Sequence, residues 1–295
     1  MIRRSLFLVV IVTIAATAAL AQTQSYEQRL ADLYLSHIDG RVTTYYSPGF
    51  EKRADELGKM LAEAAAFYEK KLAIKQEIKL AVLSPEHWKA VGLQVPYGVP
   101  NAQLPAVIFM AANTDNATSA GTAALKPLIS AATLKAIEKS GMSFDEAAWR
   151  SVDLLSVHEL GHIYTRTYGI DPANRWLSEF LASYFAYAFF KERHPKLARL
   201  FVAESNAFVE AIKPKYSSLA DFERLYFGVG LESYSWYQAK FSLKVEQVYR
   251  KKKLKFLSRV RDAFPLGEAP VSLTDGLSRL EKIEPVFVSW STDLK

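Results

Sequence analysis

The stretch Leu154-Leu155-Ser156-Val157-His158-Glu159-Leu160-Gly161-His162-Ile163 decides how this chain can be interpreted. Its apolar residues recur at helical spacing, and the pattern runs from about Phe144 to Thr167, which predicts one long helix. Residues four apart share one face of a helix and lie about 6 Å apart along its axis. Two imidazoles placed in this way can both bind one Zn²⁺ ion at about 2.0–2.1 Å.

Glu159 follows His158 and lies about 100° round the helix from it. From there a carboxylate approaches a metal-bound water and can take its proton. A chance match is the alternative, with odds on the order of one per cent or less, since the chain has only five histidines. The apolar flanks indicate a buried helix, and buried histidine and glutamate side chains rarely lack partners. We therefore predict a metal site on this helix.

A catalytic zinc ion needs a third protein ligand and an open fourth position. No histidine follows the motif closely, but the segment Trp176-Leu177-Ser178-Glu179-Phe180-Leu181-Ala182-Ser183-Tyr184 has helical apolar spacing and one carboxylate. Glu179 can be a solvated helix charge, but its apolar neighbours favour burial. A buried carboxylate needs a cation or strong hydrogen-bond donors, so Glu179 is the candidate partner of the two histidines.

Together the two segments resemble the gluzincin metallopeptidases, with the closest likeness to thermolysin-like and aminopeptidase-type catalytic domains. The resemblance spans about residues Val152–Tyr187. It implies a zincin-like fold, one zinc ion per chain and a peptide or protein substrate. It also implies zinc ligands and a general base, which are His158, His162 and Glu179 as ligands and Glu159 as the base.

The chain departs from the aminopeptidase pattern in ways that affect the predicted activity. The gap between His162 and Glu179 is slightly shorter than in those families, and Phe180 stands where the aminopeptidases have glycine. The Gly-x-Met-Glu-Asn segment that anchors a free amino terminus is absent from the sequence. We therefore predict an endopeptidase rather than an aminopeptidase. A non-catalytic binding or assembly protein on the zincin scaffold is the alternative, although the intact Glu159 argues against it, and a zinc hydrolase acting on another bond is a third.

Two further expectations come from the resemblance. Gluzincins stabilise the oxyanion with a tyrosine or histidine, and the helix opening at Glu232 places Tyr234 at that position when its apolar pattern is aligned. Tyr237 is the second candidate, and packing is the ordinary role of either. Gluzincins also bind substrate backbone along an exposed strand before the zinc helix. Pro105–Met110 is either that strand or a buried core strand.

The order of elements predicts an α+β fold with a small early sheet and a mostly helical remainder. The boundaries we expect are a zincin-like lobe at residues 22–170, a helical lobe with the third ligand at residues 171–295, and a linker near Tyr168–Arg175. The elements expected before Lys126 are helices at Gln22–His37 and Phe50–Leu72, strands at Arg41–Tyr46, Ile78–Leu83 and Pro105–Met110, and loops at Val95–Leu104 and Asn113–Gly121. The second loop contains a glycosylation sequon at Asn116.

Residues 1–21 have the pattern of a secretory signal peptide. Arg3 and Arg4 precede an apolar run that ends in Ala19-Leu20-Ala21, which is a typical cleavage site. We expect cleavage near Ala21 and a periplasmic or secreted protein. An uncleaved membrane anchor is the alternative, but the run is short for a span. Removing the two arginines lowers the net charge from +6 to +4, and the chain has no cysteine for a disulfide.

The composition of the 295-residue chain, 50% hydrophobic and 23% charged, is that of a globular protein and excludes a wholly disordered chain. The basic run Arg250–Arg261 is either a solvated helix face or a weak attraction to anionic surfaces. The sequence contains no nucleic-acid reader motif, so we expect no nucleic-acid partner. His194 ends a helix and is a weaker candidate for the site. The oligomeric state is left open.

Overall fold

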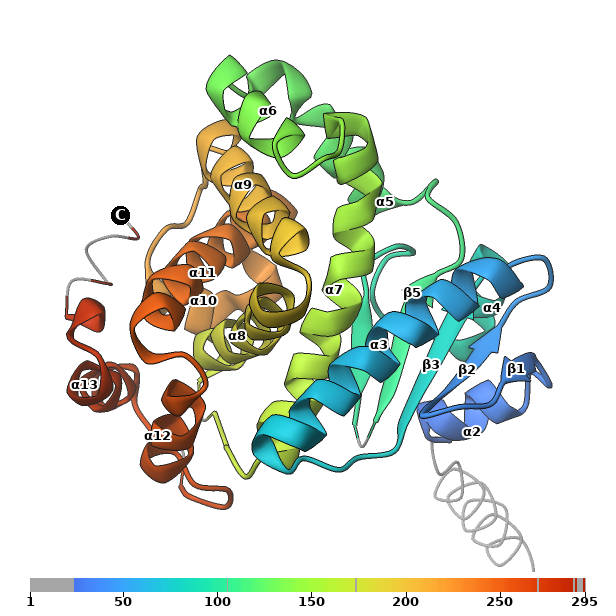
Figure 1. The fold of residues 1–295 in the computed structure, drawn as a ribbon, viewed down its shortest axis with the longest axis horizontal. Helices are drawn as coiled ribbons and strands as arrows, with labels where there is room; N and C mark the ends of the chain where they lie inside the picture. The colour runs from blue at the N-terminus through green and yellow to red at the C-terminus, as the bar shows by residue number, and fades with distance from the viewer. Residues whose placement is uncertain are drawn as a thin grey trace, which may run out of the picture.

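The computed structural model describes residues 24–294 apart from Pro105, Ala173, Pro270, Ser289 and residues 291–293. The fold is α+β, with a small mixed sheet early in the chain and a mostly helical remainder (Figure 1). This confirms the predicted order of elements. The predicted signal peptide and its cleavage site lie outside the described residues.

The sheet has five strands in the order β1-β2-β3-β5-β4. Their bounds are β1 Ser36–Ile38, β2 Val42–Tyr46, β3 Ile78–Leu83, β4 Asn101–Gln103 and β5 Val107–Ala111. The three central strands are parallel, whereas β1 and β4 are antiparallel edge strands. Strands β3 and β5 are apolar almost throughout because both faces of the sheet centre are covered.

Helices cover the two faces of this sheet unequally. Alternate side chains of β3 and β5 point to opposite faces. Leu80 and Ile108 join the large core under α3 (Glu51–Leu72) and α7 (Phe144–Thr167), whereas Ala81 and Phe109 join a small cluster under α2 and α4. The remaining helices are α2 Tyr26–Ala31, α4 Pro85–Val91, α5 Ala117–Ala124, α6 Ala131–Glu138, α8 Arg175–Arg193, α9 Pro195–Ala211, α10 Leu219–Leu225, α11 Leu231–Lys252, α12 Lys255–Ala263 and α13 Leu273–Ile283.

The first predicted helix is wrong in extent. Helix α2 ends at Ala31, Tyr34 takes a left-handed φ of 50°, and Ser36–Ile38 forms β1 against β2. Antiparallel pairing with β2 therefore overrides the helical spacing of the apolar residues. The predicted strand at Arg41–Tyr46 and helix at Phe50–Leu72 are confirmed within one residue, and the strand at Ile78–Leu83 is confirmed.

The predicted loop at Asn113–Gly121 is wrong in its second half, because α5 starts at Ala117. Asn116 is the N-cap of this helix, and its side-chain oxygen accepts hydrogen bonds from the N–H groups of Thr118 and Ser119 at 3.1 and 3.0 Å. The asparagine is buried. The sequon is therefore a helix cap and not an accessible glycosylation site.

Helices α7 and α8 pack closely enough to exclude a side chain at Gly161. A Cβ atom there would lie 2.5 Å from the carbonyl oxygen of Ala182 on α8, so glycine is needed for this backbone approach. One hydrophobic core extends from Val42 to Leu294 and includes residues on both sides of the predicted lobe boundary at 170. The two predicted lobes thus share a core.

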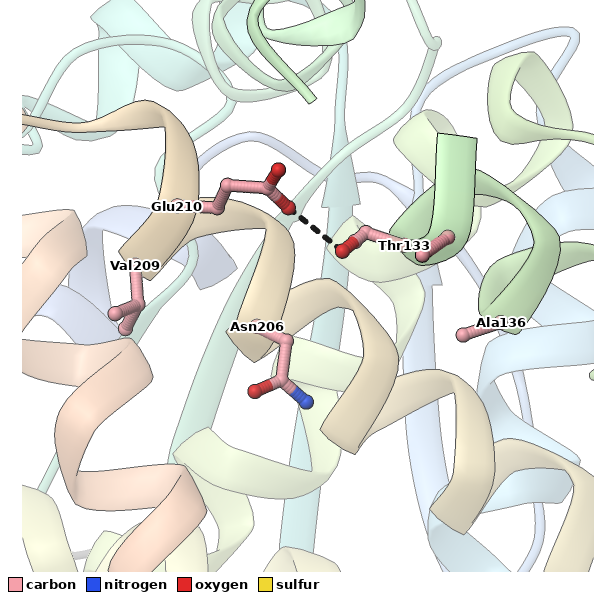
Figure 2. A pocket seen from close by; sticks show the side chains of 6 residues that line it. Thr133, Ala136, Asn206, Val209 and Glu210 are labelled. Atoms are coloured by element: carbon pink, nitrogen blue, oxygen red, sulfur yellow. Dashed lines mark hydrogen bonds between the residues drawn. The ribbon is translucent and has the colours of Figure 1, made fainter. Parts of the chain in front are cut away.

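Glu210 on α9 binds the start of α6 through two hydrogen bonds, at a place away from the contact between α7 and α8. The Glu210 carboxylate accepts a hydrogen bond from the Ser130 N–H at 2.7 Å. It accepts another from the Thr133 hydroxyl at 2.6 Å (Figure 2). Thr133 and Glu210 line a shallow hollow between the two helices. Within the described residues, no helix is both long and apolar enough to cross a membrane.

Candidate metal centre

The two histidines of the motif lie together on α7. Their ring centroids are 4.9 Å apart, and His158 is buried while His162 is half-buried. A ligand atom from each, with one from Glu159, lies within 4.8 Å of the others. This group could hold a metal ion.

Glu179 reaches the same place from α8. Its Oε2 atom lies 3.2 Å from Nε2 of His158 and 3.6 Å from Nε2 of His162. Ligand atoms around a tetrahedral ion with bonds of about 2.0–2.1 Å are roughly 3.3 Å apart. The two imidazole nitrogens and this carboxylate oxygen therefore have the spacing that one small tetrahedral ion requires. The structure thus brings all three sequence-predicted ligands together.

Serines of α8 orient both imidazoles. Nδ1 of His158 lies 3.1 Å from the Ser183 hydroxyl, and Nδ1 of His162 lies 3.3 Å from the Ser178 hydroxyl. Engaging Nδ1 leaves Nε2 of each ring facing Glu179, as in metal sites where a second contact sets the ring orientation. These contacts depend on the close approach of α8 at Gly161.

Two residues that the sequence analysis missed hold the Glu179 carboxylate. The Tyr226 hydroxyl donates to Oε1 at 2.5 Å, and the Gln238 amide donates to Oε2 at 2.7 Å. They lie 47 and 59 positions beyond Glu179 in the chain. Tyr226 also has an unusual backbone, with φ 50° and ψ −116°. Such strain in a non-glycine residue is typical of functional sites, but nothing in the local sequence signals it.

The charges of the site are strongly coupled. Burial works against the charged form of Glu179, yet the two imidazoles outweigh burial and hold the pKa of this carboxyl well below its usual value. Burial also opposes charge on His162, but the Glu179 and Glu159 carboxylates outweigh it and raise the pKa of His162 to about 9. Without a metal, the stable state near neutral pH is therefore an imidazolium–carboxylate pair, with positive charge where a cation would bind.

Glu159 faces the edge of the sheet. The Ala102 N–H on β4 donates to its Oε2 atom at 2.7 Å. Burial raises the pKa of Glu159, and the Glu179 carboxylate adds to this, while the two imidazoles and the Ala102 N–H work against it. The carboxylate therefore lies beside the ligand set and holds a proton more readily than an exposed glutamate.

The strand next to this carboxylate is not the predicted one. Strand β5, the expected Pro105–Met110 element, is fully buried between β3 and β4, so of its two predicted roles the core strand is correct. The edge strand is β4, which lies in the segment predicted to be a loop, Val95–Leu104. Three half-buried residues, two of them polar, carry too short an alternation to be recognised as a strand.

The two candidate tyrosines of α11 lie in different surroundings. The Tyr234 ring stacks on Phe222 and Phe227, with centroids 5.8 and 4.9 Å apart, and lies 5.8 Å from the Tyr226 ring. Burial, with the charge of Glu179, raises the pKa of Tyr234 well above its usual value. Tyr237 is buried instead in the core, where its hydroxyl donates to the Ser218 carbonyl at 2.7 Å.

The remaining histidines are engaged elsewhere. His194 contacts the Glu63 carboxylate at 2.8 Å, His87 contacts the Ser47 hydroxyl at 2.7 Å, and His37 lies 3.5 Å from Asp39. The hollow between α6 and α9 in Figure 2 contains none of the metal-centre residues.

No protein-family model, no curated protein and no solved structure matches this chain. The functional interpretation therefore rests on the residues and their geometry.

Proposed function

We propose that this protein is an exported zinc-dependent metallopeptidase of the gluzincin type, acting on internal peptide bonds. One observation carries the proposal. The Oε2 atom of Glu179 lies 3.2 Å from Nε2 of His158 and 3.6 Å from Nε2 of His162, and Glu159 lies beside these three ligand atoms. Nitrogen and oxygen donors in this number suit zinc and leave a fourth position for water or substrate. A purely structural site has no use for the extra carboxylate of Glu159.

The ligands would be His158, His162 and Glu179. The bound ion would supply Lewis-acid chemistry, polarising the scissile carbonyl and acidifying a water molecule. Glu159 would accept the proton of the attacking water and deliver it to the leaving amine. The same carboxyl group can then act as the acid, because it holds the proton it has accepted.

The edge strand β4 suggests how a peptide would be held. Strand β4 pairs with β5 along one side only. An extended peptide could add to its other side, where Ala102 already directs its N–H toward Glu159.

Tyr234 would be protonated at neutral pH, as any tyrosine is, and the raised pKa only reinforces this, so its hydroxyl could donate to the developing oxyanion.

The test is a comparison of wild type with Glu159→Gln. We expect both proteins to hold about one zinc per chain by metal analysis, because the ligands are unchanged. On an unbiased peptide library the variant should lose about a hundredfold or more in kcat, since the amide has a similar shape but cannot accept the proton.

Equal cleavage by both proteins would show that Glu159 is not the general base. Zinc binding without cleavage of any peptide by wild type would contradict the peptidase proposal and favour a binding or assembly role. An absence of zinc in wild type would contradict the metal assignment.

A further inference from the structure

One end of the molecule carries an exposed cationic surface with an apolar side chain among the charges. It lies where α12, the end of α7 and the connection between α3 and β3 come together (Figure 1). The Thr167 hydroxyl lies 3.4 Å from the Gln76 amide oxygen, and the Arg261 guanidinium lies 4.6 Å from the Tyr168 ring centroid, which ties the three segments together. We define the basic end by its exposed residues Lys75, Arg166, Lys255, Arg259, Arg261 and Leu266.

The basic run of the sequence divides in the structure. Lys251 and Lys252 pair with the buried carboxylate of Glu284 at 2.8 and 3.4 Å, so these two lysines join α11 to the end of α13. Lys255 and Arg259 instead follow one another on the solvent side of α12, whose opposite side is buried. Lys255 and Arg259 are therefore the exposed cations that the run contributes to this end of the molecule.

Leu266 is held outward by an ordered turn. Its N–H donates to the Gly169 carbonyl at 3.1 Å, and the preceding Pro265 forms a β-bridge with Ile170. On the other side, Arg279 holds Glu268 through two hydrogen bonds of 2.7 and 3.0 Å. The leucine is nevertheless 55% exposed. Arg261 contacts the neighbouring Tyr168 ring, so the exposed leucine and a cation are anchored to the same Tyr168–Gly169 segment.

Acidic groups at this end reduce the charge without cancelling it. Glu77 and Asp262 are exposed and Asp171 is half-buried, and Asp262 lies 4.0 Å from Arg261. Against these three carboxylates stand the five cations of the basic end. The surface as described is therefore net positive.

We propose that the basic end binds peripherally to an anionic lipid membrane, with Leu266 entering the interfacial region. Cationic side chains gain from the negative surface potential of such a membrane, and an exposed leucine gains by leaving water at the headgroup boundary. A soluble anionic polymer would use the charges but not the leucine, so the combination favours lipid. This proposal is independent of the metal centre.

The experiment measures sedimentation of the full chain with phosphatidylcholine vesicles that contain or lack phosphatidylglycerol. We expect stronger binding to the anionic vesicles, and loss of that difference between about 0.1 M and 1 M salt as screening shortens from about 10 to 3 Å. Lys255→Glu combined with Arg259→Glu should weaken binding at least tenfold, since each cation contributes about fivefold. Leu266→Ser, made alone in the wild-type chain, should also weaken binding to the anionic vesicles, but it should leave the salt dependence of that binding unchanged.

The matched control is Lys135→Glu combined with Lys139→Glu, which makes the same charge change at two exposed residues four apart, one on α6 and one at its C-cap, at the other end of the molecule. Neutral vesicles correct for binding by residues outside the described part of the chain. Equal weakening in both double variants would overturn the proposal, because net charge alone would then explain binding. So would undiminished binding of Leu266→Ser together with equal binding to soluble polyphosphate. Zinc content and peptide cleavage should not change in any of these variants.

Discussion

Two buried glutamates on successive helices differ in what surrounds them. Glu179 on α8 is 2% exposed and Glu204 on α9 is 8% exposed. Imidazoles surround the first, and the Tyr226 hydroxyl donates to it, so its pKa lies well below the usual value. The second has an oxygen without a hydrogen-bond partner among the described residues, and burial raises its pKa well above the usual value.

The difference lies in the partners that surround each carboxylate. Removing a carboxylate from water is unfavourable in either place, and only a cation or several donors can offset it. Around Glu179, which lies on α8, these partners are assembled from α7, η2 (Tyr226–Val229) and α11. Around Glu204 no such assembly is described, so burial shifts that side chain toward its neutral, protonated form. Burial alone therefore does not identify a site, whereas burial with convergent partners does.

The largest expected effect separates these two carboxylates directly. Glu179→Ala should reduce bound zinc to background, as should His158→Ala, because each removes one of three ligands. Glu204→Ala is the matched control and should leave zinc at about one per chain. Metal analysis after dialysis measures this. If Glu179→Ala still held about one zinc per chain, Glu179 would not be the third ligand, and the proposed difference in role between Glu179 and Glu204 would be wrong.

The next effect concerns the two tyrosines of α11. Tyr234→Phe should lower kcat by about a hundred- to a thousandfold with little change in KM or zinc, because an oxyanion donor acts mainly in the transition state. Tyr237→Phe should leave kcat nearly unchanged and instead reduce stability, because its hydroxyl is bonded to the Ser218 carbonyl in the core. A larger loss of kcat at Tyr237 would show that the assignment is inverted.

A smaller effect is expected at the hydroxyl that holds Glu179. Tyr226→Phe should weaken zinc affinity by about ten- to a hundredfold, the usual result of removing a partner of a metal ligand. Competition with a chelator of known affinity provides the measurement, and circular dichroism checks the fold. Gln238→Leu should act in the same direction through Oε2. Unchanged affinity in both variants would mean that the two imidazoles alone position the carboxylate.

The smallest effect is a pH dependence at Glu204. Because folding raises the pKa of this carboxyl, the folded state binds its proton more tightly than the unfolded chain does. Its contribution to stability is therefore greatest below the unfolded value of 4.5 and falls as pH rises above it. Glu204→Gln should lose less stability than wild type as pH rises above 4.5 in chemical unfolding, at no more than roughly 1.4 kcal/mol per pH unit. Parallel curves for the two proteins would show that Glu204 has a partner in solution.

The pattern of apolar residues was sufficient to predict the long helices and the longer strands, which contain many helical turns or a longer run of apolar and β-branched residues. The helix expected from Phe144 to Thr167 has those bounds in the structure, since 24 residues contain many repeats of the pattern. The three-residue strands β1 and β4 were missed, because elements of this length are created by pairing with their neighbours. Strand β1 was assigned to a helix on apolar spacing alone.

The sequence by itself determined that His158, Glu159 and His162 would be neighbours, because the geometry of one helix turn places residues four apart on one face. It also determined that Glu179 would be buried, because its neighbours are apolar. Only the tertiary structure decided that Glu179 meets both imidazoles, that Tyr226 and Gln238 hold it, and that β4 lies against Glu159. Those contacts join residues far apart in the chain, and they depend on how closely helices approach, which one glycine against Ala182 permits.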